Sequence, residues 1–406
     1  MNSAAGKTVL ALNGGSSSIK FALFADEDIG RRTLHGKIER IGLDGTALTA
    51  VVGGRQEPIS KTLPAGDFAA AIRFLIEWLD ERMALASVVA IGHRVVHGMQ
   101  RSAPTRITAG VLDELRTVIP YDPEHLPAEI QLMDQMLQHC PALPQVACFD
   151  TAFHRTMPRV ATLLPLPRRY DALGVQRYGF HGLSYAYLME RLGELGDPAA
   201  RQGRVILAHL GNGASLCAVR DGASVDTTMG FTPGAGVPMS TRTGDIDPGL
   251  LSFFAGKEQM TPQRFQKMVT HESGLLGISG VSSDIRDLLK IENTDPPAAE
   301  AVALFCQEIR KRIGAFAAVL GGVDTVVFAA GIGENSPAIR ERICANLEFL
   351  GVSVARAPNE ANAAVISEPG SRVTVRVIPT DEERMIAQLT QRQVRKRATG
   401  PAVISD

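Results

Sequence analysis

The chain has 406 residues, of which 45% are hydrophobic and 21% are charged, and its formal net charge is −1. A single hydrophobic core stops growing at about 250–300 residues, so this length predicts two domains. The balanced charge excludes the broad basic surface of a general nucleic-acid binder, although a few clustered arginines would still bind an anion. No stretch approaches the roughly 18 apolar residues of a membrane helix, and the N-terminus lacks the apolar run of a secretory signal.

The five cysteines are odd in number, and no two of them form a C-x-x-C pair. This spacing excludes a zinc ribbon and a disulfide framework. We expect Cys140, Cys148, Cys217, Cys306 and Cys344 to be reduced residues in the core of a cytoplasmic protein. From the balanced charge and the lack of a long apolar stretch, we expect neither nucleic acid nor a membrane as partner.

In chain order, the first predicted elements are short apolar runs separated by glycine and serine, a pattern typical of consecutive antiparallel strands. Apolar residues at helical spacing then predict a helix, followed by a buried strand, two more helices and a strand that ends near Asp150. The three opening strands span Thr8–Leu12, Lys20–Phe24 and Thr33–Ile41, the first helix Phe68–Met83, the buried strand Val88–Val96, and the two further helices Val111–Val118 and Glu129–Leu137. The proline-rich stretch Pro158–Arg169 marks a candidate domain boundary.

The second half of the chain repeats the opening of the first. The run VLALNGGSSSIKFAL from Val9 aligns with ILAHLGNGASLCAVR from Ile206, with identical leucine, alanine, glycine and serine positions. Each copy predicts a strand, a tight turn of small residues and a second strand. Two such units, one opening each half, indicate an internal duplication.

The last predicted elements are a long helix, a buried strand, a glycine-rich turn, a further strand and a final helix. They span Ala298–Leu320, Val323–Ala330, Gly331–Asn335, Val373–Pro379 and Asp381–Val394. Like Gly14–Ser18 and Gly211–Gly213, the turn at Gly331 follows an apolar strand. Small residues in such turns let backbone N–H groups approach an anion closely.

Three segments place basic residues in otherwise apolar surroundings. Arg94, in GHRVVHG, stands at the end of a predicted buried strand, where an unpaired charge is prohibitively costly. It is therefore either half of a structural ion pair or an empty site for a carboxylate or phosphate. RYGFHG and STRTGDIDPG pose the same alternatives for His181 and Arg242. The absence of G-x-S-x-G and H-E-x-x-H motifs excludes the common serine hydrolases and zinc proteases.

Six acidic residues are candidates for holding a metal, although each is also compatible with a helix cap or a surface position. Mg²⁺ needs only one or two carboxylates in addition to water and substrate phosphates. The six are Asp150, Asp245, Asp247, Asp284, Glu334 and Glu382.

Ten motifs occur in order between Asn13 and about Ala387: NGGSSSIKF, GHRVVHG, FDTAFH, RYGFHG, HLGNGAS, TMGFTP, TRTGDIDP, SSDIRDL, GIGEN and PTDEE. In these motifs the sequence resembles the acetate/propionate/butyrate kinase family, which belongs to the actin, hexokinase and chaperone-ATPase superfamily. The resemblance implies an α/β fold of two duplicated ribonuclease-H-like (actin-like ATPase) domains with a nucleotide cleft between them. It also implies an N-terminal domain of residues 1–150 plus 385–406, and a C-terminal domain of residues 151–384 that carries the nucleotide loops and a homodimer interface.

The resemblance further implies an activity. It is the reversible in-line transfer of the γ-phosphoryl group of ATP to acetate, which gives acetyl phosphate and ADP, with Mg²⁺ or Mn²⁺ as the metal. A preference for propionate or butyrate is the alternative within the family. An ATPase without a carboxylate substrate is an alternative within the superfamily. A protein that binds nucleotide only for regulation is disfavoured, because the catalytic set is complete.

The same resemblance assigns roles to individual residues. Arg94 binds the substrate carboxylate, Asp150 is the catalytic aspartate, and His181 and Arg242 stabilise the transferring phosphoryl group. Three apolar residues form the acyl pocket, namely Val96, Phe180 and Pro233, and two residues form the magnesium site, namely Asn13 and Glu382. Nucleotide contacts fall on Lys20, His209, Leu210, Gly211, Asn212, Gly213, Asp284, Ile285, Arg286, Gly331, Ile332, Gly333, Glu334 and Asn335.

The sequence departs from the family pattern in a few places. Gly14 stands where cysteine is usual, Ser240 replaces a glycine, and Tyr185 replaces a histidine; Gly234–Pro238 also differs from the usual run. Ile119–Leu126 replaces a Pro-Leu-His-Asn-Pro stretch that lies near the acyl pocket in the family. Because one methylene is worth only about 1–3 kcal/mol of discrimination, small changes there are enough to shift preference between acetate and propionate.

Overall fold

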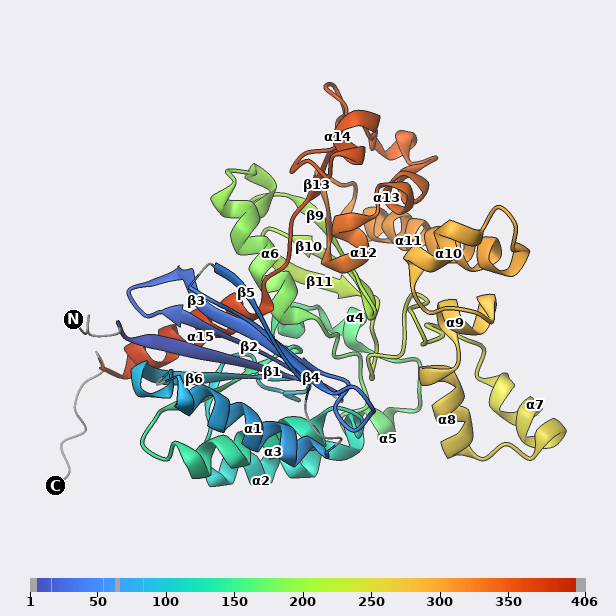
Figure 1. Cartoon of the computed structure of the whole chain (residues 1–406). Helices are drawn as coiled ribbons and strands as arrows, with labels where there is room; N and C mark the ends of the chain where they lie inside the picture. The colour runs from blue at the N-terminus through green and yellow to red at the C-terminus, as the bar shows by residue number, and fades with distance from the viewer. Residues whose placement is uncertain (1–5, 16, 54, 63–65, 83, 399–406) are drawn as a thin grey trace. The chain divides into compact units, whose positions relative to one another are not determined.

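The structure, a computed structural model, describes residues 6–15, 17–53, 55–62, 66–82 and 84–398 (Figure 1). Three of the sequence-based predictions extend outside the described residues. They are the turn that includes Ser16, the helix that ends at Met83, and the part of the N-terminal domain at residues 399–406. The chain divides into two compact units, one of Met1–Ala152 with Asp381–Asp406 and the other of Phe153–Thr380. The proline-rich stretch 158–169 lies inside the second unit, where it contributes to two short helices, α4 (Arg159–Thr162) and α5 (Arg168–Asp171).

The first unit is built on one sheet with the strand order β5-β4-β3-β2-β1-β6-β8-β7. Strands β1 to β5 form an antiparallel meander, and β6 and β8 run parallel to β1. The sequence did not predict β4, β5 or the two-residue β7. The strands span Thr8–Gly14 (β1), Ser18–Ala25 (β2), Asp28–Glu39 (β3), Ala47–Val52 (β4), Arg55–Thr62 (β5), Val88–Val95 (β6), Thr105–Arg106 (β7) and Gln145–Phe149 (β8).

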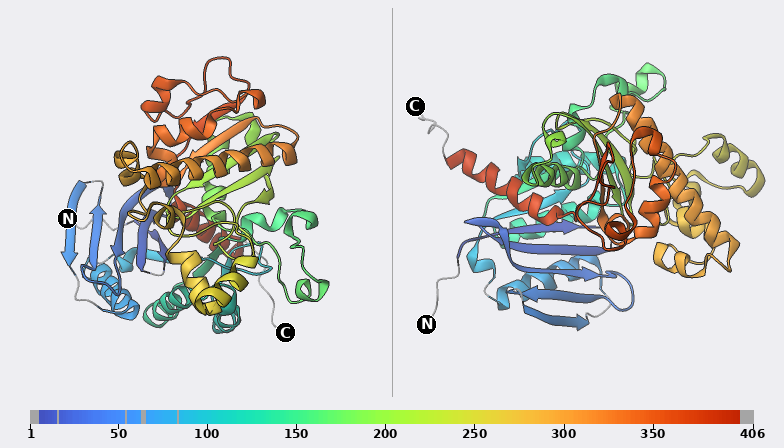
Figure 2. Two further views of the ribbon diagram at one scale, coloured as in Figure 1. Left: turned by 90° about the vertical axis from the view of Figure 1, so that its right-hand side faces the viewer. Right: turned by 90° about the horizontal axis from the view of Figure 1, so that it is seen from above.

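Helices cover both faces of this sheet. Successive strand residues point to opposite faces. On β6, Ile91 joins the apolar core under α1 (Phe68–Glu81), whereas Gly92 faces α15 (Glu382–Ala398). Helix α3 (Leu126–His139) contributes Leu132 to the same core as α1 and packs against α2 (Ala109–Val118). Figure 2 shows α15 alongside the first strands. Two short 3₁₀ helices, Leu85–Ser87 and Ile119–Tyr121, complete the unit.

The second unit repeats this plan. Its sheet has the order β11-β10-β9-β12-β13, which matches β3-β2-β1-β6-β8 strand for strand. In both sheets the first three strands are antiparallel, and the fourth and fifth run parallel to the first. The repeat seen in the sequence is therefore a repeat of topology, and the predicted duplication is confirmed. The strands span Arg204–Leu210 (β9), Ala214–Arg220 (β10), Ala223–Thr227 (β11), Thr325–Ala329 (β12) and Thr374–Val377 (β13).

The long helix α11 (Pro296–Leu320) packs on strands β9 and β10 of the second sheet. It begins where Asp295 caps its N-terminus, and it buries an apolar stripe that includes Phe305, Ile309 and Ile313. The other helices are α6 (Gly182–Glu194), α7 (Gly249–Glu258), α8 (Pro262–His271), α9 (Gly274–Ser279), α10 (Ile285–Ile291), α12 (Ala330–Asn335), α13 (Pro337–Cys344) and α14 (Arg356–Glu360), with 3₁₀ turns at Ala152–Thr156, Pro198–Ala200 and Glu348–Leu350.

Three expectations compare directly with the fold. The predicted glycine turn at 331–335 is wrong, because these residues form helix α12; Ala330 takes the left-handed conformation at the strand-to-helix junction, with φ of 64°. Four of the five cysteines are buried and free, as expected, while Cys140 is partly exposed. Within the described residues, no helix is long and apolar enough to cross a membrane.

Candidate active site

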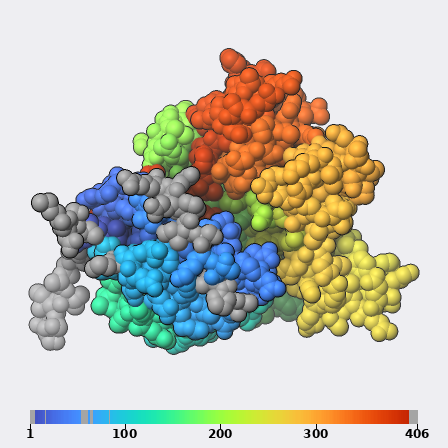
Figure 3. All heavy atoms as spheres, viewed as in Figure 1, coloured from blue at the N-terminus to red at the C-terminus, as the bar shows by residue number. Residues whose placement is uncertain are grey.

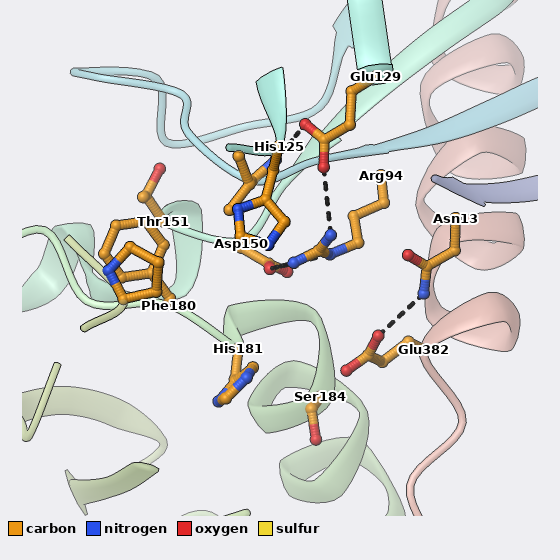
Figure 4. A network of polar contacts seen from close by, with 12 residues as sticks. Asn13, Arg94, His125, Glu129, Asp150, Thr151, Phe180, His181, Ser184 and Glu382 are labelled. Atoms are coloured by element: carbon orange, nitrogen blue, oxygen red, sulfur yellow. Dashed lines mark hydrogen bonds and ion pairs between the residues drawn. The ribbon is translucent and has the colours of Figure 1, made fainter. Parts of the chain in front are cut away.

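In the first unit, Arg94 lies at the end of β6 between two carboxylates. Its Nη2 and Nε atoms donate to Oδ2 of Asp150 at 2.7 and 3.0 Å, and Nη1 donates to Oε1 of Glu129 at 3.1 Å (Figure 4). Asp150 follows β8, the parallel neighbour of β6, so the two strands end at the same edge of the sheet. Arg94 is therefore ion-paired in the structure, and whether it also binds a carboxylate or phosphate remains a prediction.

Glu129, from α3, is a residue that the sequence did not single out. Its side chain is 1% exposed, and its second oxygen accepts the backbone N–H of Val96 at 2.8 Å. Burial raises the pKa of Glu129, and the Arg94 guanidinium and the Val96 amide act in the opposite direction by favouring the ionised form. The spacing of apolar residues predicts that Glu129 lies in a helix, but it does not predict that its side chain is buried.

Asn13 and Glu382, the predicted metal residues, are brought together in the first unit. The Asn13 side-chain amide donates to Glu382 Oε2 at 3.0 Å (Figure 4). It also donates to Glu383 Oε1 at 3.3 Å. Lys20 lies directly opposite Asn13 in the β1–β2 ladder, so both side chains leave the same face. One amide oxygen and one carboxylate are donors of the kind that Mg²⁺ takes beside water and phosphate oxygens, and the residues therefore fit that metal. Among the described residues there is no cluster of three or more histidine, cysteine or acidic side chains that could hold a metal.

In the second unit, His181 and Arg242 converge on the glycine turn that follows β9. A methyl group placed on Gly213 would lie 3.2 Å from His181 Nε2, a tight contact, and 3.6 Å from Arg242 Nη1, an ordinary one, so both side chains lie directly against this glycine. The Nδ1 atom of His181 lies 2.8 Å from the hydroxyl of Ser215, and this contact directs Nε2 toward the turn. Arg242 is anchored by the Pro233 carbonyl at 3.2 Å.

Aromatic and hydroxyl contacts fix the orientation of the His181 ring further. It stacks on His209, with ring centroids 4.1 Å apart, and His209 Nδ1 lies 2.8 Å from the hydroxyl of Ser184. The hydroxyl of Tyr185, one of the departures from the family pattern, lies 2.5 Å from that of Ser215. Tyr185 thus supports the partner of His181.

The predicted nucleotide loops of the second unit lie at one sheet edge. Because β9 and β12 are parallel neighbours, His209 pairs with Ala329 in register, and the loop His209–Gly213 lies beside α12. Glu334 acts as a structural acceptor there, since its Oε1 accepts the backbone N–H of Ala330 at 2.7 Å and of Thr380 at 3.0 Å.

The third predicted nucleotide segment starts helix α10. Asp284 caps this helix by accepting the Arg286 amide at 2.9 Å, and the two side chains form an ion pair at 2.5 Å. The capping alternative is therefore confirmed. The Arg286 side chain is 80% exposed, and Ile285 is buried against the body of the unit.

The acyl-pocket candidates are divided between the units. Val96 is buried in the first unit just after Arg94, and Phe180 is buried in the second. The Phe180 carbonyl is 3.0 Å from His154 Nε2, whose other ring nitrogen lies 3.0 Å from the hydroxyl of Ser224. Pro233 also belongs to the second unit, next to Arg242.

Two copies of one five-stranded α/β plan, each with polar side chains and small-residue turns at its strand ends, define a duplicated, actin-like ATPase fold. The model of the acetokinase family matches residues 8–388, and the chain belongs to that family.

The relatives cover the chain almost completely. An acetate kinase of Methylocella silvestris is 45% identical over 95% of this chain and 97% of its own length. A propionate kinase of Citrobacter rodentium is 43% identical over 94% and 95%. The crystal structure of Porphyromonas gingivalis acetate kinase matches with a TM-score of 0.87 at 36% identity, and the match covers 96% of this chain and 100% of that one.

Proposed function

We propose that the protein is an acetate kinase, which transfers the γ-phosphoryl group of ATP reversibly and in line to acetate to give acetyl phosphate and ADP. The observation that carries this proposal is the position of Arg94, held by Asp150 at a sheet edge where Asn13 and Glu382 also meet. An arginine oriented by a buried carboxylate is suited to binding another small carboxylate. The acetate kinase of Methylocella silvestris, 45% identical, supports the same activity.

The chemistry needs little acid–base help from the protein. A carboxylic acid is already ionised at pH 7, so no strong general base has to create the nucleophile. Catalysis then depends on positioning and on stabilising the charge of a metaphosphate-like transition state. We assign the first task to Arg94 and Asp150, and the second to His181 and Arg242, whose nitrogen atoms already converge on Gly213.

The nucleotide is assigned to the second unit together with Lys20 of the first. The backbone of His209–Gly213 and of α12 offers N–H groups at one sheet edge, and Asp284–Arg286 is assigned to the base and ribose. Mg²⁺, when bound, neutralises charge on the phosphate oxygens. Asn13 and Glu382 would hold it, and Mn²⁺ has the same oxygen preference.

With these assignments, each unit contributes residues to the transfer of the phosphoryl group from ATP to acetate. In the first unit, Arg94 fixes the acetate carboxylate, and Val96, the next residue but one, packs against its methyl group. In the second unit, the family resemblance assigns Phe180 and Pro233 to the acyl group. The second candidate, a preference for propionate, is supported by the 43% identical propionate kinase.

We further propose that the enzyme is a cytoplasmic homodimer. Helix α7 has no buried residue among Gly249–Glu258, and Phe253 on it is 59% exposed; its segment stands clear on the surface in Figure 3. A second copy of the chain would cover this apolar helix. The proposal is tested by sedimentation of the purified protein and of Phe253→Asp. The wild type should sediment as a dimer and the variant should dissociate more readily, whereas a monomeric wild type would contradict the proposal.

The proposed activity is tested by incubating the protein with ATP, Mg²⁺ and a panel of two-, three- and four-carbon acids, with hydroxylamine to trap the acyl phosphate. Acetyl hydroxamate as the main product supports an acetate kinase, and a higher kcat/KM on propionate supports the second candidate. ATP hydrolysis that no carboxylic acid changes would contradict both and favour an ATPase.

A further inference from the structure

The side chain of Glu129 has no role in the proposed reaction, yet it contacts two residues that do. One oxygen accepts from Arg94, the proposed carboxylate-binding residue, and the other from the backbone of Val96, the proposed acyl-pocket residue. Its exposure is 1%, so water does not satisfy either oxygen. The acid therefore ties together the two ends of the place where the substrate is expected to bind.

The hydrogen atoms of the Arg94 guanidinium can be assigned one by one. A guanidinium has five N–H donors in a fixed plane. Asp150 Oδ2 takes those of Nε and one of Nη2, and Glu129 takes one of Nη1 at 3.1 Å. The second N–H of Nη1 points to the Gly14 carbonyl at 3.5 Å. One N–H of Nη2 remains for a ligand.

An incoming carboxylate binds arginine best through two parallel N–H groups. The edge formed by Nε and Nη2 is held by Asp150, so a second pair exists only between Nη1 and Nη2. That pair becomes complete when Glu129 releases Nη1. The Glu129 contact is the one that yields, because it is single and longer, at 3.1 Å, whereas Asp150 holds two N–H groups, the nearer at 2.7 Å.

We propose that Glu129 is a positioning residue that competes with the substrate carboxylate for Arg94 and so sets the affinity of the enzyme for its carboxylic acid. This inference rests on the proposed function. In the empty site Glu129 holds the guanidinium and the Val96 amide in place. When the acid binds, its carboxylate takes over Nη1 while Glu129 keeps the amide. The competition weakens acid binding and leaves nucleotide binding unaffected.

The test compares Glu129→Gln with wild type in the hydroxylamine assay, varying the acid and ATP separately. Glutamine keeps the size of the side chain and an oxygen for the Val96 amide, but it presents no carboxylate to Arg94. We expect the KM for acetate to fall by about ten-fold, the KM for ATP to stay within about two-fold, and kcat to decrease because Arg94 is held less firmly. A purely structural role would not lower one KM selectively.

Asp134→Asn is the matched control. Asp134 lies on the same helix and pairs with Arg116 at 2.5 Å, so the control also removes a carboxylate from an arginine, but at an exposed site. It should leave both KM values unchanged. If Glu129→Gln does not fold, Glu129→Asp replaces it, since the shorter acid keeps the charge but cannot reach Arg94 and the Val96 amide together; it should lower the KM for acetate less.

The outcomes separate this inference from the proposed function. If the wild type forms no acyl hydroxamate with any acid, the proposed function is wrong and the inference falls with it. If the wild type forms acetyl hydroxamate but the variant has an unchanged or raised KM for acetate, the function stands and the competition is wrong. A fall in both KM values by the same factor also overturns it.

Discussion

Arg340 is a fully buried arginine on α13 whose donors all go to uncharged acceptors. Its guanidinium donates to the carbonyls of Gly333 and Glu334 at 2.9 and 3.0 Å, to Oδ1 and the carbonyl of Asn359 at 2.8 and 2.7 Å, and to Asn362 Oδ1 at 2.7 Å. Burial lowers the pKa of Arg340 to about 10. The side chain therefore links the end of α12 to the segment around α14.

We expect Arg340→Met to destabilise the protein by about 3–5 kcal/mol. Methionine fills the space but leaves five acceptors without their arginine donor. Three of these hydrogen bonds are buried and count at about 1 kcal/mol each or more, the two part-buried ones count less, and part of the loss is offset because a buried lone cation is itself unfavourable. The KM for ATP should also rise, since the carbonyls at the end of α12 lose their anchor.

The measurement is urea unfolding of the purified variant together with steady-state kinetics. Arg356→Met on α14 makes the same substitution where the arginine side chain is 85% exposed and pairs with Glu360 at the surface, so its unfolding midpoint should match the wild type. If Arg340→Met unfolded at the midpoint of this control, the buried network would have no energetic weight and the reasoning would be refuted.

Three further predictions concern single residues. Arg242→Ala should lower kcat by about 10²–10³-fold in the hydroxylamine assay, the size of one lost oxyanion donor, and near-wild-type turnover would refute its role. Burial lowers the pKa of His154 to about 4, so the histidine of the unfolded chain is protonated first and the free energy of unfolding falls as the pH drops below about 6.5. His154→Asn should remove about 2 kcal/mol of that loss between pH 7 and pH 5. In urea unfolding, the midpoint of the variant should therefore depend less on pH than that of the wild type. Gly92→Ala should prevent stable folding, because its methyl group would collide with α15, whereas Gly14→Ala, with its nearest neighbour at 3.3 Å, should stay folded; equal thermal melting of the two would contradict this.

Much of the fold could be predicted because its signals are local. The repeated strand–turn–strand units at Val9 and Ile206 became the β1–β2 and β9–β10 hairpins, and the helical spacing after Phe68 became α1. Strand β5 was missed because Arg55–Thr62 is mostly polar, with Ile59 as its one large apolar residue, whereas β4, with the run ALTAVV, has a composition typical of a strand. The turn expected at Gly331 is a helix, since Glu334 satisfies the amide of Ala330 at its start and Arg340 the carbonyls at its end, and neither contact is visible in the local sequence.

The residues of the site were predictable by motif, but their partners were not. Arg94 stood out because a charge in an apolar strand needs an explanation, and the structure supplied two, Asp150 and Glu129. Asp150 lies at the end of the neighbouring strand, so its contact with Arg94 could have been predicted from the pairing of the two strands. Glu129 comes from a helix with polar residues on several sides, and only its packing decides that this acid, and not Asp134, turns inward. A motif names the group that binds the substrate, whereas the strength of that binding is set by neighbours that only the folded chain brings into contact.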